Sequence, residues 1–354
     1  MSCEDGLAAL NLQMPRRVPR TEYSAEFHWP LIRTVTGIEV TGQSPDDLKD
    51  KAVQAFVRAW DYDLFWHTLI HKDDLGGYHT DMGHARYAEE GVDFRPVETD
   101  QVVFEDPEQV LSFDPVQTLP AHDPGELVRR FEQHYRTNCL ERPTGVNMTG
   151  IYITLVSGLI DLLGWDMLLL AAGTDPARFG RLADRYAEWM QTHFDALAES
   201  SVPVVMVHDD IVWTSGAFMH PDWYRRHVFP NYRKYLTPLR EAGKKILFTS
   251  DGNYTDFIDD LVACGVHGLV MEPTTDMAYV ARRYGRTHVF IGNADTRILL
   301  SGTRDQIRAE VQRCMNIGKE CPGFFMAVGN HIPPNTPVAN ALYYNQVYEE
   351  LSTR

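Results

Sequence analysis

The stretch KKILFTSDGN at residues 244–253 decides the fold. Its apolar run, 246–248, has the composition of a buried strand, and it ends in a polar cluster around Asp251. The preceding segment SVPVVMVHDD (201–210) and the following segment VHGLVMEP (266–273) repeat this order of apolar run and acidic end. Such strand ends are typical of a site at the carboxyl edge of a parallel sheet.

The second half of the chain alternates strands with helices. Beyond these three strands, we expect strands at 288–295 and 323–333 and helices at 220–244, 254–265, 276–285, 303–318 and 338–351. Pro230 and Pro238 should kink or divide the first of these helices. Repeating β–α units predict parallel strands, and no GxGxxG motif supports a dinucleotide-binding sheet. An α/β fold of the (β/α)8 TIM-barrel type fits 354 residues better than an open doubly wound sheet.

The first 120 residues are harder to assign, and we expect a helical and loop extension of one domain that spans 1–354. A helix is predicted at 44–63 and another from 123 to 135, with a long loop or small hairpin at 71–102. Within this extension, residues 60–120 are a candidate lid over the mouth of the barrel. The apolar region 150–173 is interrupted by acidic residues and glycines, which favours a buried helix and a turn over a membrane span.

Composition narrows the class of protein. The net charge of −16 argues against binding to nucleic acid or to an anionic membrane surface. Five cysteines without a CxxC pair suit a reducing cytoplasm and disfavour a zinc knuckle. The N-terminal basic residues follow the apolar ones, which is not the order of a signal peptide.

Five consecutive predicted strands end in polar side chains. These are His208, Asp209 and Asp210; Thr249, Asp251 and Asn253; Glu272; Asn293 and Asp295; and Asn330 and His331. In a barrel, the carboxyl ends of the strands meet at one mouth, so these side chains should converge on one site.

Each of these residues also has an ordinary structural explanation. Asp209 or Asp210 can cap the next segment, and Asp295 can cap a helix at Thr296. Asp251 can form an Asx turn, Glu272 can be an exposed loop acid, and His331 can bond to its own loop. The histidines His67, His71, His79 and His84 have irregular spacing, and solvated loop positions are the favoured interpretation.

The second half resembles the uroporphyrinogen decarboxylase superfamily, whose fold is a TIM barrel. The resemblance lies in HDDIVWTSGAFMHPDWYRRHVFPNYRKYLTPLREAGKKILFTSDGN (208–253), GLVMEPTTDMAYVARRYG (268–285), IGNADTRILLSGTRDQIRAEV (291–311) and GNHIPPNTPVANALYY (329–344), and RVPRTE (17–22) is similar to the family's start. The decarboxylase arm carries an arginine-rich stretch that grips the carboxylates of a tetrapyrrole. Here RTEYSAEFHWP (20–30) offers Glu26 and His28 instead, which disfavours that substrate.

The other arm holds corrinoid-dependent methyltransferases. Their methylcobamide:coenzyme M members hold zinc on a His-x-Cys pair and a later cysteine, where this chain has Thr249, Asp251 and Asn330. The thiolate site is therefore missing, and thiol activation is in doubt. An oxygen-rich set replaces it, and Asp251, Glu272 and His331 are the tentative ligands for a divalent metal, with zinc the first choice.

The resemblance implies methyl transfer from a small methoxylated substrate, with an aromatic compound the first expectation, to the cobalt of a separate corrinoid protein, as in O-demethylation. Asp251, Glu272, His331 and Asp210 are the expected catalytic residues, because protonating the ether oxygen or binding it to a Lewis acid assists its departure. The expected substrate-binding residues are His208, Asp209, Trp213, Asn253, Asn293, Asn330, Phe27 and Tyr152, and Trp29 and Phe218 are further candidates for an aromatic lining. No corrinoid-binding DxHxxG motif occurs in this chain, so the corrinoid would belong to the partner.

Two alternatives remain open. One is a decarboxylase or lyase for a small carboxylic acid or a tetrapyrrole-type substrate in the same barrel, which arginines at the mouth, such as Arg297, would favour. The other is a non-catalytic barrel that binds a ligand or a partner, in which replacing Asp251 or Glu272 would change no activity.

Overall fold

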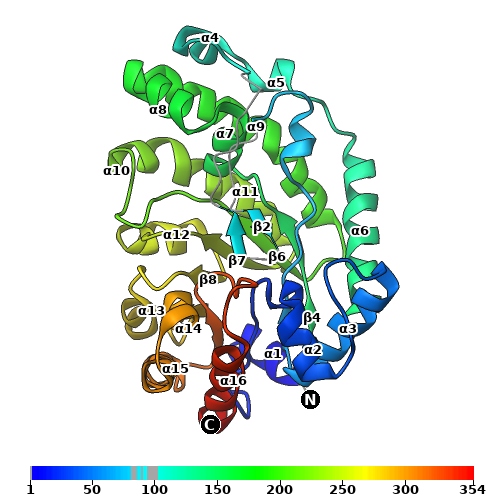
Figure 1. Ribbon diagram of the computed structural model, residues 1–354. Coiled ribbons are helices and arrows are strands. Elements are labelled where there is room, and N and C mark those ends of the chain that lie inside the picture. Colours follow the sequence, from blue (N-terminus) through cyan, green and yellow to red (C-terminus); the bar gives the residue numbers. More distant parts are fainter. Residues whose placement is uncertain (1, 81–85, 89–90, 94–102) are drawn as a thin grey trace.

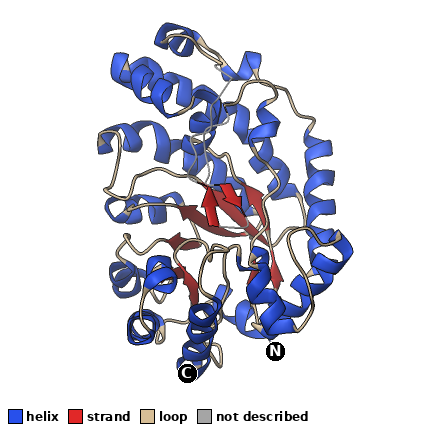
Figure 2. Ribbon diagram, viewed as in Figure 1, coloured by secondary structure: helices blue, strands red, loops and turns tan. Residues whose placement is uncertain are grey.

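The structure is a computed structural model that describes residues 2–80, 86–88, 91–93 and 103–354. Strands lie at its centre and helices surround them (Figure 2). One sheet runs in chain order through β5 (Thr149–Ile151), β6 (Val204–His208), β7 (Lys245–Ser250), β8 (Gly268–Met271), β9 (Val289–Ala294) and β10 (Phe324–Val328), and every pair in it is parallel. The predicted β–α alternation is therefore confirmed.

An N-terminal segment extends this sheet beyond β5. β1 (Leu64–Phe65) pairs in parallel with β4 (Val146–Asn147), which leads into β5. Further along, the Leu69 N–H donates to the Gly150 carbonyl at 2.9 Å, and the Tyr152 N–H donates to the Ile70 carbonyl at 2.9 Å. Residues 64–70 thus run beside 146–152 as one more barrel strand.

A second N-terminal segment closes the ring. The Met326 N–H in β10 donates to the Pro19 carbonyl at 2.8 Å, and the Asp63 N–H donates to the Arg20 carbonyl at 2.9 Å. Residues 17–23 therefore lie between β10 and the segment that contains β1. Within the described residues, the backbone hydrogen bonds join eight strand segments in a continuous ring, as in a (β/α)8 barrel. The N-terminal part, expected to be an extension, supplies two of these segments.

Side chains alternate between the two sides of the barrel wall. Val204 and Met206 point into an interior cluster with Leu247, Val270 and Phe325, while Val205 and Val207 pack outward against the helices. This is the period-two pattern of a strand that is buried on both faces. α1 (Ser2–Leu10) contributes Ala9 and Leu10 to the interior cluster, and so closes the amino-terminal end of the barrel.

The outer helices agree with most predictions. They include α3 (Asp46–Ala59), α6 (Pro124–Glu141), α9 (Pro176–Glu199), α10 (Pro221–Trp223), α11 (Phe229–Glu241), α12 (Ile258–Cys264), α13 (Met277–Tyr284), α15 (Arg304–Gly318) and α16 (Val338–Ser352) (Figure 1). A π-helical turn at Tyr224–Val228 divides the predicted helix 220–244 just before Pro230, and Pro238 lies inside α11. Gly265, with a φ of 97°, ends α12 in the left-handed region.

Shorter elements complete the described chain. They are α2 (Trp29–Thr36), α4 (Pro107–Ser112), α5 (Pro115–Thr118), α14 (Thr296–Ser301), the 3₁₀ turns Ala25–Phe27, Lys72–Leu75 (η2) and Thr255–Phe257, and the antiparallel pair β2 (Arg86–Ala88) and β3 (Gly91–Asp93). The pair β2 and β3 agrees with the hairpin considered for 71–102, whereas His84 and the parts of the expected lid at 81–85 and 94–102 lie outside the described residues.

The apolar region 150–173 forms a bent pair of helices. α7 (Val156–Leu163) is buried along its whole length, and α8 (Trp165–Thr174) follows after Gly164 at an angle of 107°. Of the helices that the structure describes, none alone is long and apolar enough to cross a membrane, although this bent pair together meets the criteria of length and composition. The predicted buried helix and turn are confirmed.

A buried ion pair holds the closing segment in place. The Arg20 guanidinium lies 2.7 Å from Glu22 Oε1, and both side chains are fully buried. Glu22 Oε2 accepts a hydrogen bond from the Val328 N–H at 3.0 Å, at the end of β10. Arg20 in turn lies over the rings of Trp60 and Tyr348, with its carbon Cζ 4.8 and 4.5 Å from the ring centroids.

We expect Glu22→Ala to lower the free energy of unfolding by about 3–5 kcal/mol, because it leaves the Arg20 charge buried without a counter-ion. Urea denaturation measures the change. Glu39→Ala, which removes an exposed carboxylate, is the matched control and should stay within about 0.5 kcal/mol of the wild type. A Glu22→Ala loss as small as that of the control would show that the pair does not hold the ring.

Candidate functional site

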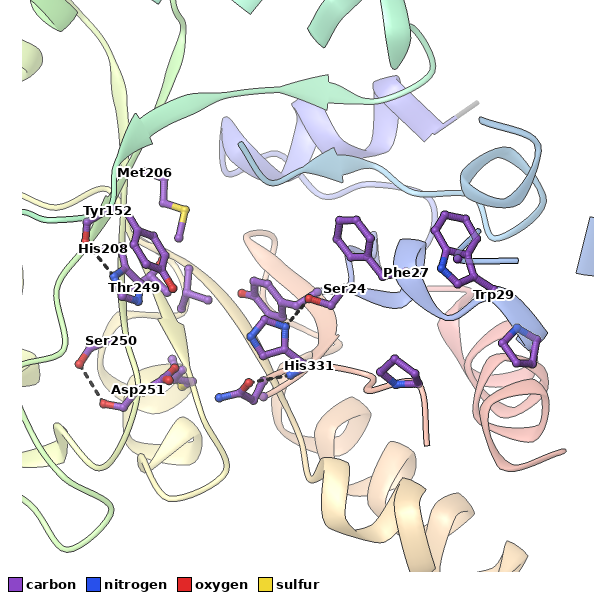
Figure 3. Close-up of a pocket in the computed structure, with 18 of the residues that line it drawn as sticks. Ser24, Phe27, Trp29, Tyr152, Met206, His208, Thr249, Ser250, Asp251 and His331 are labelled. Atoms are coloured by element: carbon purple, nitrogen blue, oxygen red, sulfur yellow. Dashed lines mark hydrogen bonds between the residues drawn. The ribbon is translucent and has the colours of Figure 1, made fainter. Parts of the chain in front are cut away.

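A cavity of about 800 Å³ opens at the carboxyl ends of the barrel strands. On one side, Tyr152, His208, Thr249 and Asp251 come from the strands, and on the other side Phe27 and Trp29 come from the N-terminal segment (Figure 3). Its full lining is Tyr23, Ser24, Phe27, Trp29, Pro30, Arg33, Val40, Thr41, Gly42, Tyr152, Met206, His208, Thr249, Ser250, Asp251, Val270, Met271, Gly329, Asn330, His331 and Pro334. The predicted mouth of the barrel is therefore hollow, with aromatic walls and a polar floor.

Strand register explains why acidic residues meet at this floor. His208 pairs with Thr249, and Ser250 pairs with Met271. Continuing this register past the strand ends brings Asp210, Asp251 and Glu272 to neighbouring positions. The three carboxylates of three different loops thus come together because their strands are in register.

Backbone groups hold two of these carboxylates. Asp210 Oδ1 accepts a hydrogen bond from the Asp251 N–H at 2.8 Å. Glu272 Oε2 accepts one from the Gly252 N–H at 2.7 Å, and Glu272 Oε1 accepts one from Asn330 Nδ2 at 2.6 Å. Since the loop after β7 donates to both neighbours, its own carboxyl, Asp251, is fixed between two negative charges.

The pKa of Asp251 is raised well above its ordinary value. Burial of the carboxyl is the largest cause, and the charges of Asp210 and Glu272 raise the pKa further. A hydrogen bond with Asn330 opposes them only in part. Solvent nevertheless reaches Asp251 through the cavity, so a carboxyl group whose protonated form is favoured touches the space where a substrate would bind.

His208 lies beside this acid and stacks on Tyr152. The two rings are 4.1 Å apart at an angle of 7°, and His208 Nδ1 donates to the Tyr152 carbonyl at 3.2 Å. That bond leaves Nε2 facing Asp210 Oδ1 at 3.5 Å. The imidazole therefore lies between the Tyr152 carbonyl and the Asp210 carboxylate at the cavity wall.

His331 faces the acid from the opposite loop. Its Nδ1 is hydrogen-bonded to Ser24 Oγ, and its backbone N–H donates to Asn330 Oδ1 at 2.8 Å. Burial and the nearby His208 lower the pKa of His331 to about 4, so the imidazole is neutral at pH 7. The site therefore combines a protonated carboxyl with a neutral imidazole.

Four predicted substrate-binding residues lie away from the cavity. The Asp209 carboxylate accepts hydrogen bonds from the N–H groups of residues 155–157 at 2.5–3.1 Å, and another from Tyr232, which holds the start of α7. Asn253 Oδ1 accepts from Thr255, and Asn293 Nδ2 donates to the Glu272 carbonyl at 3.1 Å. Trp213 is 43% exposed and packs on Phe218. Asp209 is therefore structural, but the helix start that it holds is α7, an earlier element, and not the next segment of the chain.

The remaining candidate residues outside the cavity have structural or surface positions. Asp295 accepts from the Arg297 N–H and so caps α14, and Arg297 pairs with Asp295 at 2.7 Å and does not reach the cavity. His28 is also structural, since its Nε2 is bonded to the Thr336 carbonyl at 2.7 Å. His71 is exposed, whereas His67 is half-buried, which differs from the solvated position expected for it.

Several lining residues could not be predicted from any sequence pattern. Ser24, Arg33 and Thr41 belong to a segment with no regular pattern, and only the closure of the barrel brings them to the mouth. Met206 lies inside a strand that is apolar throughout, and its place in the cavity follows from the inward alternation of β6.

The predicted metal set does not have the spacing of a ligand cluster. Within the described residues, the group of three acidic, histidine or cysteine side chains whose ligand atoms lie within 4.8 Å of one another is found elsewhere in the fold, and it contains none of Asp251, Glu272 and His331. The arrangement fits proton transfer better than metal ligation.

Comparison with known proteins places this barrel among its relatives. The sequence profile described as uroporphyrinogen decarboxylase (URO-D) matches residues 91–350. The chain belongs to the uroporphyrinogen decarboxylase family. The family accounts for the barrel and for a site at the carboxyl ends of its strands.

Individual relatives of the uroporphyrinogen decarboxylase family are distant. The uroporphyrinogen decarboxylase of Thermus thermophilus is 29% identical over 178 residues, and that of Carboxydothermus hydrogenoformans is 26% identical over 180 residues. The chain spans about half the length of these curated relatives, since the matches cover 50% of this chain and 50% and 49% of theirs. A solved structure, a methyltransferase from Methanosarcina mazei, superposes with a TM-score of 0.64 at 18% identity over 98% of both chains. That similarity establishes a shared fold.

Two acidic residues of the site should respond oppositely to neutral substitution. We expect Asp209→Ala to lower the free energy of unfolding by about 3 kcal/mol, because it leaves buried N–H groups of α7 without acceptors. Asp251→Asn should raise the free energy of unfolding. The raised pKa of Asp251 means that folding loses stability as pH rises through that pKa, so the gain should be larger at pH 8 than at pH 5.

Urea denaturation of both variants at the two pH values measures these effects. Asp256→Asn, an exposed residue of the same loop, is the control and should change neither value. A loss of stability in Asp251→Asn that grows with pH would contradict the assignment of a protonated carboxyl.

Proposed function

We propose that this chain is a methyltransferase that removes the methyl group of a small methoxylated aromatic compound and passes it to a corrinoid carried by a separate protein. The observation that carries the proposal is Asp251, a carboxyl group with a raised pKa, on the floor of an aromatic-walled cavity. The similarity in fold to a methyltransferase from Methanosarcina mazei supports it. Zinc at this floor is not part of the proposal.

The cavity suits an uncharged aromatic substrate. Its volume of about 800 Å³ lies within the range of small-molecule sites, and Phe27, Trp29 and Tyr152 offer ring faces for stacking. Among the described residues that line it, Arg33 alone carries a permanent positive charge. A tetrapyrrole with many carboxylates would need more cationic partners than this.

Asp251 supplies the proton that the reaction requires. Breaking the bond between the methyl carbon and the ether oxygen leaves a phenolate, which is a poor leaving group until it is protonated. When bound at the mouth, the reduced cobalt of the corrinoid supplies the nucleophile for the methyl group. Asp251 gives its proton to the departing oxygen, a phenol forms, and solvent in the cavity returns a proton to the carboxylate.

The neighbours of Asp251 position this acid. Asp210 and Glu272 keep its pKa high, and Asn330 bridges Glu272 to Asp251. Neutral His331 faces the same space and can donate or accept a hydrogen bond to the substrate oxygen through Nε2. The five unpaired cysteines suit the reducing conditions of a cytoplasm.

A decarboxylase for a small aromatic acid is the second candidate. Arg33 at the mouth could hold one carboxylate, and the curated relatives are decarboxylases. In that case carbon dioxide would form without a corrinoid, and Arg33→Ala would abolish the reaction.

We expect the purified protein to convert one or more methoxyaromatics to phenols when a Co(I) corrinoid is supplied, free or on its carrier protein. Asp251→Asn should lower the rate by about 10²–10⁴-fold, because the proton donor is lost while the cavity keeps its shape. The measurement is phenol release, together with the absorption spectrum of the corrinoid. Asp256→Asn should keep the full rate.

No phenol from any donor, with a corrinoid proven active with another enzyme, would contradict the methyltransferase proposal. Release of carbon dioxide from methoxybenzoic or tetrapyrrole acids under the same conditions would establish the decarboxylase instead. A full rate in Asp251→Asn would refute the role of Asp251 alone.

The pH profile gives a separate prediction. Because Asp251 acts in its protonated form, the rate should fall as pH rises through its raised pKa. Asp210→Asn removes one of the negative charges that raise this pKa, so the alkaline fall should move to lower pH. Initial rates across pH measure the shift, with Asp256→Asn as the control. An unchanged profile would show that another group limits the rate.

A further inference from the structure

A second cluster of ligand-type side chains lies outside the cavity. Asp74 belongs to η2, His122 to the loop before α6, and His193 to α9, and their ligand atoms all lie within 4.8 Å of one another. These residues are widely separated in the sequence, and the fold alone brings them together. The cluster shares no residue with the lining of the cavity.

The imidazole of His193 is buried without a well-formed hydrogen bond. Its side chain is fully buried, and neither ring nitrogen makes a hydrogen bond of normal geometry, although the backbone of Met190 is close enough to interact with the ring. A buried imidazole without a partner is unfavourable, because it has lost water and gained no hydrogen bond.

The other two side chains surround that ring. His122 lies 4.8 Å from His193 between ring centroids, at an angle of 65°. Asp74 Oδ1 accepts a hydrogen bond from Arg130 Nη1 at 3.0 Å, and Asp74 Oδ2 accepts one from the His71 N–H at 3.3 Å. Each carboxylate oxygen has a second lone pair, so Asp74 can bind a cation while these bonds orient it.

Helix α9 presents the buried ligand rigidly. Trp189 lies one turn before His193, with the rings 5.0 Å apart, and its Nε1 donates to the Pro120 carbonyl at 2.8 Å. That bond fixes the loop that carries His122. Two of the three ligands are thus held by one buried tryptophan, which is the kind of support that metal ligands receive.

We propose that Asp74, His122 and His193 bind a divalent transition-metal ion, for which zinc suits the donor set best. Two imidazole nitrogens and one carboxylate are a common zinc set, at distances of about 2.0–2.2 Å. Tetrahedral ligands at that distance lie about 3.3 Å apart, so small side-chain rotations close the cluster around the ion. Since His122 is partly exposed, solvent can provide a fourth ligand.

The position of the site gives the ion a supporting role. It would join η2 to α9, two elements from different halves of the chain. The ring of His71, at the start of η2, lies 5.6 Å from that of Tyr152, which stacks on His208 in the cavity wall. An ion bound to Asp74 would therefore hold the layer behind that wall. This inference does not depend on which reaction the cavity performs.

The test is zinc binding to the full chain, purified without a histidine tag and treated with a chelator. After dialysis against zinc chloride and removal of free metal, elemental analysis should find one zinc per chain. Competition with a chromophoric chelator should show that His122→Ala and Asp74→Asn each weaken binding by about 100-fold or more, since losing a ligand exceeds the 10–100-fold effect of losing its supporting contacts.

Controls separate this site from the cavity and from misfolding. Asp251→Asn and His288→Ala should keep the full zinc content, because Asp251 lies in the cavity and His288 is bonded to its neighbour Thr287. Circular dichroism should show that His122→Ala and Asp74→Asn are folded. A wild-type protein that binds no zinc, or zinc that persists in both ligand variants or disappears in Asp251→Asn, would overturn the proposal.

Discussion

The barrel depends on the fully buried ion pair between Arg20 and Glu22. Two charges without water must satisfy each other, and here the guanidinium also lies over the ring of Trp60 while Glu22 accepts the Val328 N–H. Because separating either buried charge from its partner costs free energy, residues 17–23 stay between β10 and the segment that contains β1. The next residues, Tyr23 and Ser24, therefore lie at the mouth of the barrel, where Ser24 is hydrogen-bonded to His331.

A second constraint comes from the strands themselves. Their register places Asp210, Asp251 and Glu272 side by side at the floor of the barrel mouth, where three full negative charges would repel one another, and Asp251 alone of the three lines the cavity. Holding Asp251 as a neutral acid relieves the repulsion. This arrangement of three carboxyl groups weakens the fold at alkaline pH. It also provides a proton at the place where a substrate would react. Functional sites often reduce stability in this way.

The sequence predicted the features that rest on local patterns. The strands and helices after residue 200 follow from apolar runs, helix periodicity and glycine ends, and the carboxylates at 210, 251 and 272 follow from their place after the strands. It could not separate Asp209 from Asp210, since neighbours on a strand face opposite sides and only the structure shows which one meets α7. Nor could it find the two N-terminal barrel segments, whose short and irregular pairing depends on distant partners.

His193 illustrates the same limit. In the sequence it is one histidine on a long amphipathic helix, and only its buried position beside His122 and Asp74 makes it notable. When the residues of a cluster are far apart in the sequence, they have no fixed spacing that a sequence motif could detect.

The chemistry proposed for this site requires that Asp251 is protonated. Infrared difference spectroscopy measures the protonation of a carboxyl group directly. Other buried carboxyls, such as Asp161 with a pKa of about 7, also absorb, so the spectrum of Asp251→Asn is subtracted from that of the wild type at pH 7. If Asp251 is protonated, the wild type should show a protonated-carboxyl band that is absent from the variant and that shifts when aspartate is labelled with ¹³C. A difference spectrum that shows only an ionised carboxylate at residue 251 would contradict the account.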